Sequence, residues 1–220
     1  MWKQDSILAN YSEHTPCKDI FQAVCDLIGD HYQNLDWKYA RSRPKITFKD
    51  KQFKMEVAFW SSGYNTPGDY VNLEIIPAIC SLELIKHYKE QGESTNGYIL
   101  GMMDFYHEKS EEVPAGIRRV INIDGKTTDL EEGRWPEGVL SFNKNINVYG
   151  ITPELLEKII SFIDQRIVIW LEAMNNLDLL ISLIDKLPDS SKKELKQGAF
   201  YEFLKLEFPE NLSDIDEVLC

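Results

Sequence analysis

The sequence lacks both a long hydrophobic run and a targeting segment. A membrane-spanning helix needs about 20 consecutive apolar residues, but the longest apolar helical stretch, IISFIDQRIVIWLEAM, is interrupted by Asp164, Arg166 and Glu172. The N-terminal MWKQDSILANYSEH has no basic segment followed by the apolar core of about 7 to 15 residues that a secretory signal carries. We therefore expect a cytoplasmic protein that has no membrane partner.

Cysteine is scarce, and its spacing is irregular. The four cysteines, Cys17, Cys25, Cys80 and Cys220, form no CxxC motif, whereas zinc sites and disulfide frameworks depend on regular cysteine spacing. We expect reduced thiols, no metal site and no cofactor.

The motifs of common catalytic and nucleotide-binding sites are also missing. The segment SSGYNTPGD, residues 61–69, contains two serines but lacks the G-x-S-x-G elbow that places a serine nucleophile between a strand and a helix. Its asparagine, proline and glycine are turn residues, so we interpret it as a hairpin loop. The segment IDGKTTD has Val120 where a phosphate-binding loop requires glycine.

The histidines occur singly, at positions 14, 31, 87 and 107. Only His107, in the segment DFYHE, has carboxylates close by in the sequence, namely Asp104 and Glu108. A general base or a metal site uses such a combination, but a spacing of three residues after a strand does not require Asp104 and His107 to face the same way. We predict a protein without catalytic residues and keep an enzyme with a site near His107 as an alternative.

Positive charge is in short supply. The chain has 24 Lys+Arg against 36 Asp+Glu, a net charge of −12. Residues 1–60 contain 9 basic and 8 acidic residues, so the whole excess of acid lies in residues 61–220, which contain 15 and 28. Nucleic-acid binding normally requires a basic face, and we therefore expect no nucleic-acid partner. A cationic protein partner is favoured, although solubility alone also accounts for an acidic composition.

The first half of the sequence alternates between helical and strand patterns. Apolar residues recur at helical spacing over residues 16–32, with Thr15 as the predicted cap and Pro16 at the first position of the helix. The following runs predict strands, a short helix that Ser81 caps and a buried strand. The predicted strands are 37–42, 45–48, 53–60, 70–76 and 97–106, and the short helix covers 81–92.

The second half begins with strands and ends in helices. Residues 118–150 predict a strand, a turn, an acidic loop and one or two further strands. Thr152 and Pro153 then start the helix with the strongest pattern, which continues to Met174 and is followed by two further helices within 175–208. We predict an α+β fold, an antiparallel sheet with an N-terminal helix packed on it and a C-terminal layer of about three helices. Residues 1–187 form the predicted domain, and 188–220 a helical extension whose acidic tail either frays or docks.

The acidic loop contains a tryptophan surrounded by carboxylates. Trp135 lies in DLEEGRWPEG, close to Asp129, Glu131, Glu132 and Glu137. Tryptophan is enriched at the energetic centres of protein interfaces, so we select these five residues as the predicted partner-binding site. In the competing interpretation, Trp135 folds back onto the sheet as part of the core.

Several segments resemble a group of bacterial domains of unknown function. The likeness covers about residues 16–187 and is carried by the run FKMEV, by SS and N before VNLEI, and by LLEKII followed by WLEAMNNLDLLISLI. Small acidic proteins of this kind are similar in character to immunity proteins, which neutralise bacterial toxins in the cytoplasm. The resemblance implies binding to a cognate toxin, which we expect to be a basic nuclease, and it carries over no catalytic residue. A structural subunit of a larger complex is a further alternative.

Overall fold

A computed structural model describes most of the chain. The residues outside the description are 1, 3, 5, 62, 64, 102–104, 106, 109–116, 122–126 and 132–144, and the backbone alone is described for 107–108, 117–121, 127–131 and 145.

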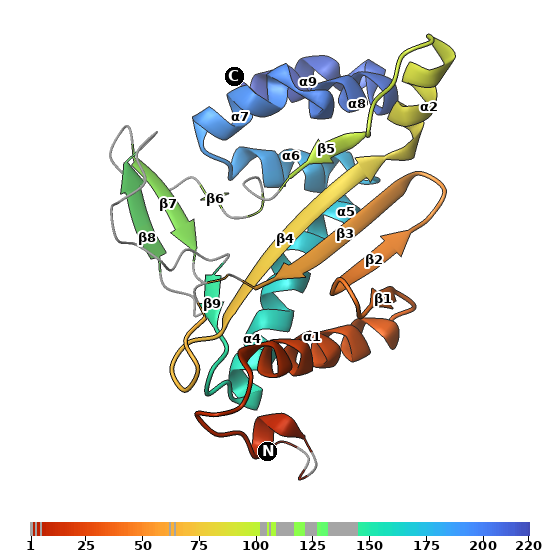
Figure 1. The fold of residues 1–220 in the computed structure, drawn as a ribbon. Coiled ribbons are helices and arrows are strands. Elements are labelled where there is room, and N and C mark those ends of the chain that lie inside the picture. The colour runs from red at the N-terminus through yellow and green to blue at the C-terminus, as the bar shows by residue number, and fades with distance from the viewer. Residues whose placement is uncertain are drawn as a thin grey trace.

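The main sheet joins six described strands, and every pairing in it is antiparallel. The order is β1–β2–β3–β4, and β5 and β9 both pair with β4, one near each of its ends (Figure 1). The strands are β1 (Lys38–Ala40), β2 (Lys45–Lys49), β3 (Phe53–Trp60), β4 (Asn72–Ser81), β5 (Tyr98–Leu100) and β9 (Asn145–Asn147). A second sheet contains β6 (His107–Glu108), β7 (Ile117–Ile121) and β8 (Thr127–Glu131).

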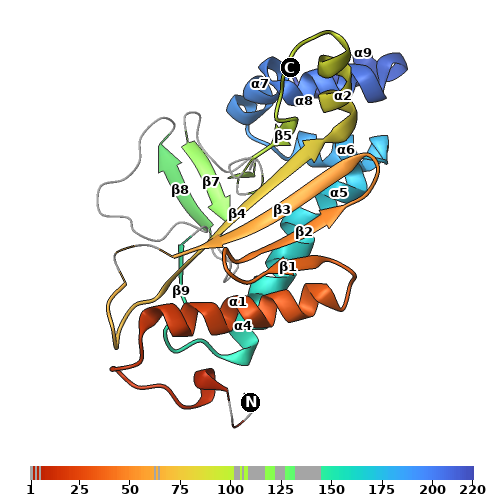
Figure 2. The same ribbon diagram turned by 45° about the vertical axis from the view of Figure 1, so that its right-hand side comes forward.

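Helices cover one face of the main sheet. In Figures 1 and 2, α4 and α5 run behind strands β2 to β4, and α1 lies along the β1 side of the sheet. The helices of the first half are η1 (Ile7–Ala9), α1 (Cys17–Gln33) and α2 (Leu82–Glu90). Those of the second half are α4 (Pro153–Phe162), η2 (Ile163–Val168), α5 (Ile169–Ala173), α6 (Leu177–Asp185), α7 (Asp189–Gln197), α8 (Ala199–Glu207), η3 (Pro209–Asn211) and α9 (Leu212–Val218). The α+β fold predicted from the sequence is confirmed.

The alternation of side chains along β3 explains why the sheet has a buried face. Phe53, Met55, Val57 and Phe59 are buried, whereas the residues between them are partly exposed. The turn before β3 is held by Asp50, whose carboxylate accepts hydrogen bonds from the backbone N–H groups of residues 52 and 53. The predicted hairpin loop at residues 61–69 connects β3 to the antiparallel strand β4, as expected.

Two predicted helix caps are confirmed and one is wrong. Ser81 and Thr152 accept hydrogen bonds from the N–H groups of residues 84 and 155, as caps of α2 and α4 do. Thr15 does not cap α1: its hydroxyl instead accepts from the N–H of Ser12, and Pro16 occupies the cap position. Since proline has no side-chain acceptor, α1 begins without a side-chain cap.

Two helices predicted as continuous are interrupted. The helix from Pro153 changes to π-helical hydrogen bonding in η2 before it continues as α5. The last predicted helix divides at Gly198, whose extended backbone ends α7 and precedes α8. Glycine favours such a break because it loses more backbone entropy in a helix than other residues do. The predicted strand 97–106 is also shorter, since β5 ends at Leu100.

The C-terminal helices share the core of the sheet. Phe203 of α8 packs edge-on against Phe53 of β3, with ring centroids 5.7 Å apart. Ile215 and Leu219 are buried in the same core, so the acidic tail docks rather than frays. The division into a domain of residues 1–187 and an extension of 188–220 stays a prediction. No helix in the described part of the chain is long and apolar enough to cross a bilayer.

Close packing between α1 and β1 generates a first prediction. A Cβ atom at Gly29 would lie 2.5 Å from the ring of Tyr39, so Gly29→Ala should force the ring to move. Overpacking costs about 1–3 kcal/mol, whereas the same change in an exposed helix gains roughly 1 kcal/mol. We expect urea unfolding to show that Gly29→Ala is less stable than the wild type.

The matched control is Gly63→Ala in the β3–β4 loop, where no described atom lies within 4 Å of the added carbon. Its free energy of unfolding should stay within about 0.5 kcal/mol of the wild type. A stabilised Gly29→Ala protein would contradict the packing argument.

Candidate functional site

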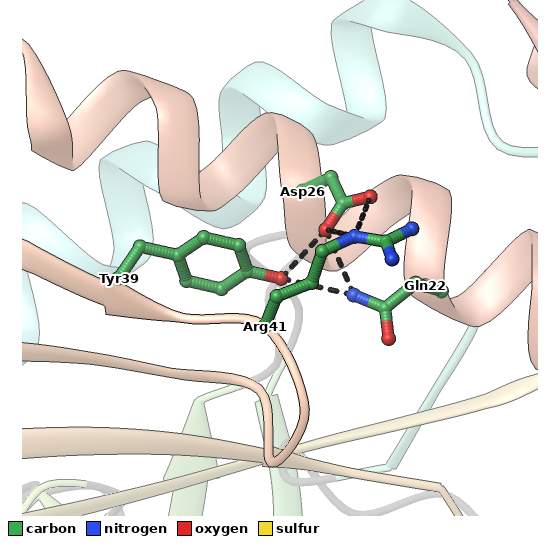
Figure 3. Close-up of polar contacts among 4 residues, drawn as sticks. All are labelled: Gln22, Asp26, Tyr39 and Arg41. Carbon is green, nitrogen blue, oxygen red and sulfur yellow. Dashed lines mark hydrogen bonds and ion pairs between the residues drawn. The ribbon is translucent and has the colours of Figure 1, made fainter.

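A carboxylate on α1 collects hydrogen bonds from three side chains (Figure 3). The Oδ1 atom of Asp26 accepts from Gln22 Nε2 at 2.8 Å, from the Tyr39 hydroxyl at 2.9 Å and from Arg41 Nε at 3.2 Å. Its Oδ2 atom accepts from Arg41 Nε at 3.1 Å. Gln22 also donates to the Tyr39 hydroxyl at 3.1 Å. These four residues, which we call the Asp26 cluster, join α1 to β1 and to the turn after it.

The environment of Asp26 keeps the Tyr39 hydroxyl and the Cys25 thiol protonated. Burial, and then the hydrogen bond to Asp26, raise the pKa of Tyr39 well above its ordinary value. Burial, and then the charge of Asp26, also raise the pKa of the Cys25 thiol. Tyr39 therefore acts as a hydrogen-bond donor and not as a base, and Cys25 is a poor nucleophile because the thiolate is the reactive form. The arrangement is suited to holding a helix on a strand and to presenting the exposed Arg41.

A second polar arrangement lies on the sheet face opposite the core. The register places Lys45 of β2 opposite Ala58, and Thr47 opposite Glu56. Because side chains alternate between faces, this face contains the residues that alternate with the core positions Ile46, Met55, Val57 and Ile75, and we call it the open sheet face. On β2, β3 and β4 it comprises Lys45, Thr47, Lys49, Lys54, Glu56, Ala58, Trp60, Glu74, Ile76 and Ala78.

Glu56 is the centre of an ion-pair network on the open sheet face. Its Oε2 atom lies 2.9 Å from Nζ of Lys54, and its Oε1 atom bonds Nζ of Lys45. The Glu56 side chain is 14% exposed. Burial acts to raise the pKa of Glu56, but the hydrogen bonds and charges of the two lysines outweigh it and lower the pKa below its ordinary value. Glu56 is therefore a charged structural partner of the lysines.

Large aromatic side chains lie at the ends of the open sheet face. Trp60, the last residue of β3, is 62% exposed, and Tyr98 of β5 is 45% exposed. Tyr98 pairs with Cys80 at one end of β4, whereas Trp60 pairs with Glu74 at the other. This surface therefore combines charge with exposed aromatic area, and aromatic side chains are enriched at protein interfaces.

The predicted partner-binding residues fall on and after β8. Asp129 and Glu131 lie within this strand, opposite Arg119 and Ile117 of β7. The expectation that they belong to a loop was wrong, because the strand ends only at Glu131. Glu132, Trp135 and Glu137 lie outside the described residues, so whether the five residues form one site stays a prediction.

The alternative of an enzyme with a site near His107 stays a prediction, because only the backbone of His107 and Glu108 is described. His107 lies in β6, where its backbone pairs with Val120, and Glu108 follows it. Asp104 lies outside the described residues. In the described part of the chain, no three His, Cys, Asp or Glu side chains are grouped as a metal site would require.

The serine loop is held by amide side chains. Asn65 donates to the Ser61 hydroxyl at 2.8 Å and accepts from the backbone N–H of Asn72 at the same distance. Asn147 of β9 accepts from the N–H of Val71 at 3.0 Å. These contacts fix the β3–β4 connection, and Ser62 lies outside the described residues.

The concentration of positive charge near the open sheet face was missed in the sequence. Residues 37–60 contain seven Lys+Arg and two Asp+Glu, a net charge of +5. Counting charge over the predicted strands, instead of over residues 1–60 as a whole, would have revealed this positive charge. The Asp26 cluster had no comparable signal, since its members are separated by up to 19 residues and each is ordinary for its position.

Comparisons with known proteins found no relative of this chain. The chain matches no protein-family model, no curated protein and no solved structure.

The Glu56 network predicts a specific pH dependence. A lowered carboxyl pKa stabilises the fold at pH values above the unfolded-state pKa of about 4.3, and this contribution is lost as the pH falls through the folded-state pKa. Glu56→Gln should therefore cost roughly 1 kcal/mol at neutral pH. The difference from the wild type should shrink toward zero as the solution is acidified below that unfolded-state pKa.

Urea unfolding at neutral and acidic pH measures the free-energy difference between Glu56→Gln and the wild type. The control is Glu157→Gln on α4, which removes one exposed carboxylate. A cost for Glu56→Gln that is the same at both pH values would show that the charge of Glu56 contributes nothing.

Proposed function

We propose that the protein is a non-enzymatic binding protein that neutralises a cationic protein toxin, such as a basic nuclease, in the cytoplasm. The observation that carries the proposal is the segregation of charge. Outside residues 37–60, 17 Lys+Arg stand against 34 Asp+Glu, a net charge of −17. Such an excess attracts a cationic partner over a long range and speeds association.

The use of carboxylates within the fold supports a binding role. Asp26, Asp164 and Asp216 each accept a hydrogen bond from a tyrosine on another element. A general acid or base must instead reach a substrate with a proton to exchange. These three carboxylates hold elements of the fold together. The remaining carboxylates on the surface are the ones that we propose contact a partner.

The contact region that we propose begins on β8 with Asp129 and Glu131 and continues through Glu132, Trp135 and Glu137. In this arrangement the carboxylates replace the phosphates that a nuclease recognises, and Trp135 supplies the apolar anchor. A toxin covered in this way cannot bind nucleic acid.

The direct test is co-expression with the product of the adjacent reading frame. We expect the two proteins to co-purify, and we expect the chain to relieve the growth defect that the partner alone causes. If that partner is not toxic, or remains toxic and unbound at equal expression, the proposal is wrong.

Charge reversal tests the contact region. Glu131→Lys combined with Glu132→Lys changes the charge by four units, so association with the toxin should slow by about tenfold or more. Most of the salt dependence of the on-rate should disappear, since screening acts over about 8 Å at physiological ionic strength. Stopped-flow binding at several salt concentrations measures both effects.

The control is Glu154→Lys with Glu157→Lys, a pair of exposed residues on α4 that gives the same change in net charge. An equal slowing in this control would assign the effect to net charge and remove β8 from the interface.

Trp135→Ala tests the anchor. Loss of a buried interface tryptophan should raise the off-rate by an amount worth about 2 kcal/mol or more, with little change in thermal stability. If Trp135 belongs to the core, the free energy of unfolding should instead fall by about 3–5 kcal/mol. Binding kinetics and thermal melting of the same variant distinguish the two.

A further inference from the structure

The open sheet face has a charge opposite to that of the rest of the molecule. Strands β1 to β3 and their turns lie in the segment with a net charge of +5. On the face itself, Lys38, which is the register partner of Thr47, and Lys45, Lys49 and Lys54 stand against Glu56 and Glu74. Lys38, Arg43 and Lys49 on these strands and turns are exposed, and none of the helices described passes over the side of β2 and β3 that faces the viewer in Figure 1. This surface is therefore both accessible and cationic.

We propose that the open sheet face is a second docking surface, which binds an acidic protein segment with interspersed apolar side chains. Its exposed lysines complement carboxylates, and Trp60 offers apolar area of the kind that forms interface hot spots. This inference is independent of the toxin interface, because it concerns other strands and the opposite sign of charge.

The central residues of the face favour a protein over a nucleic acid. Glu56 and Glu74 lie on the same face as the lysines, where the register pairs them with Ala78 and Trp60, so a phosphate backbone crossing the sheet would meet carboxylates in its path. The net charge of −12 repels any anion, and this repulsion grows with the number of charges on the ligand, so it opposes a long nucleic acid more than a short acidic segment. A protein segment can place its own donors and apolar groups opposite these residues.

Charge also disfavours a second copy of the chain as the occupant. A twofold dimer through this face would bring the same surface of each subunit together. Lysines such as Lys45 and Lys49 would then face an equally cationic surface. A partner with an acidic segment has no such conflict.

The test uses a synthetic peptide in which glutamates alternate in blocks with leucines, titrated into nitrogen-15-labelled protein. We expect saturable shifts confined to the amides of β1 to β3 and to the Trp60 indole. Lys38→Glu with Lys49→Glu should weaken binding by about tenfold or more. Trp60→Ala should weaken it without unfolding the protein, since this side chain is mostly exposed.

The control is Lys158→Glu with Lys193→Glu, an equal change of charge at exposed positions on α4 and α7, which should leave the affinity nearly unchanged. The proposal is overturned if no shifts occur, or if they spread over lysines elsewhere. Equal weakening in the control overturns it as well. Tighter binding of oligothymidylate with the same formal charge would assign the face to nucleic acid, and concentration-dependent shifts without peptide would assign it to a second copy.

Discussion

The register between β3 and β4 is the constraint on which both faces of the sheet depend. Eight consecutive residue pairs join these strands, from Phe53 with Ser81 to Trp60 with Glu74. Side chains alternate with a period of two, so a shift of one residue would exchange the faces. It would place Lys54 and Glu56 in the core and expose Met55 and Val57. The hydrophobic core and the charged open sheet face are thus two results of one pairing.

Tyrosine hydroxyls connect the peripheral elements to this sheet and to one another. Tyr32 of α1 donates to Asp164 of η2 at 2.6 Å, and Tyr201 of α8 donates to Asp216 of α9 at 2.9 Å. Burial, and then the bond to Asp164, raise the pKa of Tyr32, whereas the bond to Asp216 is the main cause of the raised pKa of Tyr201. A raised pKa means that the stabilisation is complete below the unfolded-state value of about 10 and is lost as the pH rises through the folded-state value.

Local sequence patterns were sufficient to predict the helices and strands but not the points at which a helix is interrupted. The alternation in β3 and the caps at Ser81 and Thr152 act over a few residues, and each was identified from the sequence. The π-helical segment η2 was not, because the apolar stripe continues through it without a change of pattern. Its position matters for tertiary contacts, since Asp164 in this segment bonds Tyr32 across 132 residues of sequence.

The Asp26 cluster and the open sheet face also differed in how far the sequence could predict them. A cluster such as Gln22, Asp26, Tyr39 and Arg41 is assembled by the packing of α1 on β1, and no spacing rule applies to it. The cationic strands could have been identified by counting charge over residues 37–60. The pairing of Lys45 and Lys54 with Glu56 required the register of the strands.

Opposite charges on two parts of one chain lead to different behaviour toward partners. A cationic protein is attracted from a distance by the net charge of −12, so salt slows its approach. An acidic segment is repelled at a distance and attracted only within reach of β1 to β3. At physiological ionic strength, screening over about 8 Å suppresses the distant repulsion more than the contact attraction. Moderate salt should therefore slow the approach of a cationic protein to the acidic surface more than it weakens contact between an acidic segment and β1 to β3.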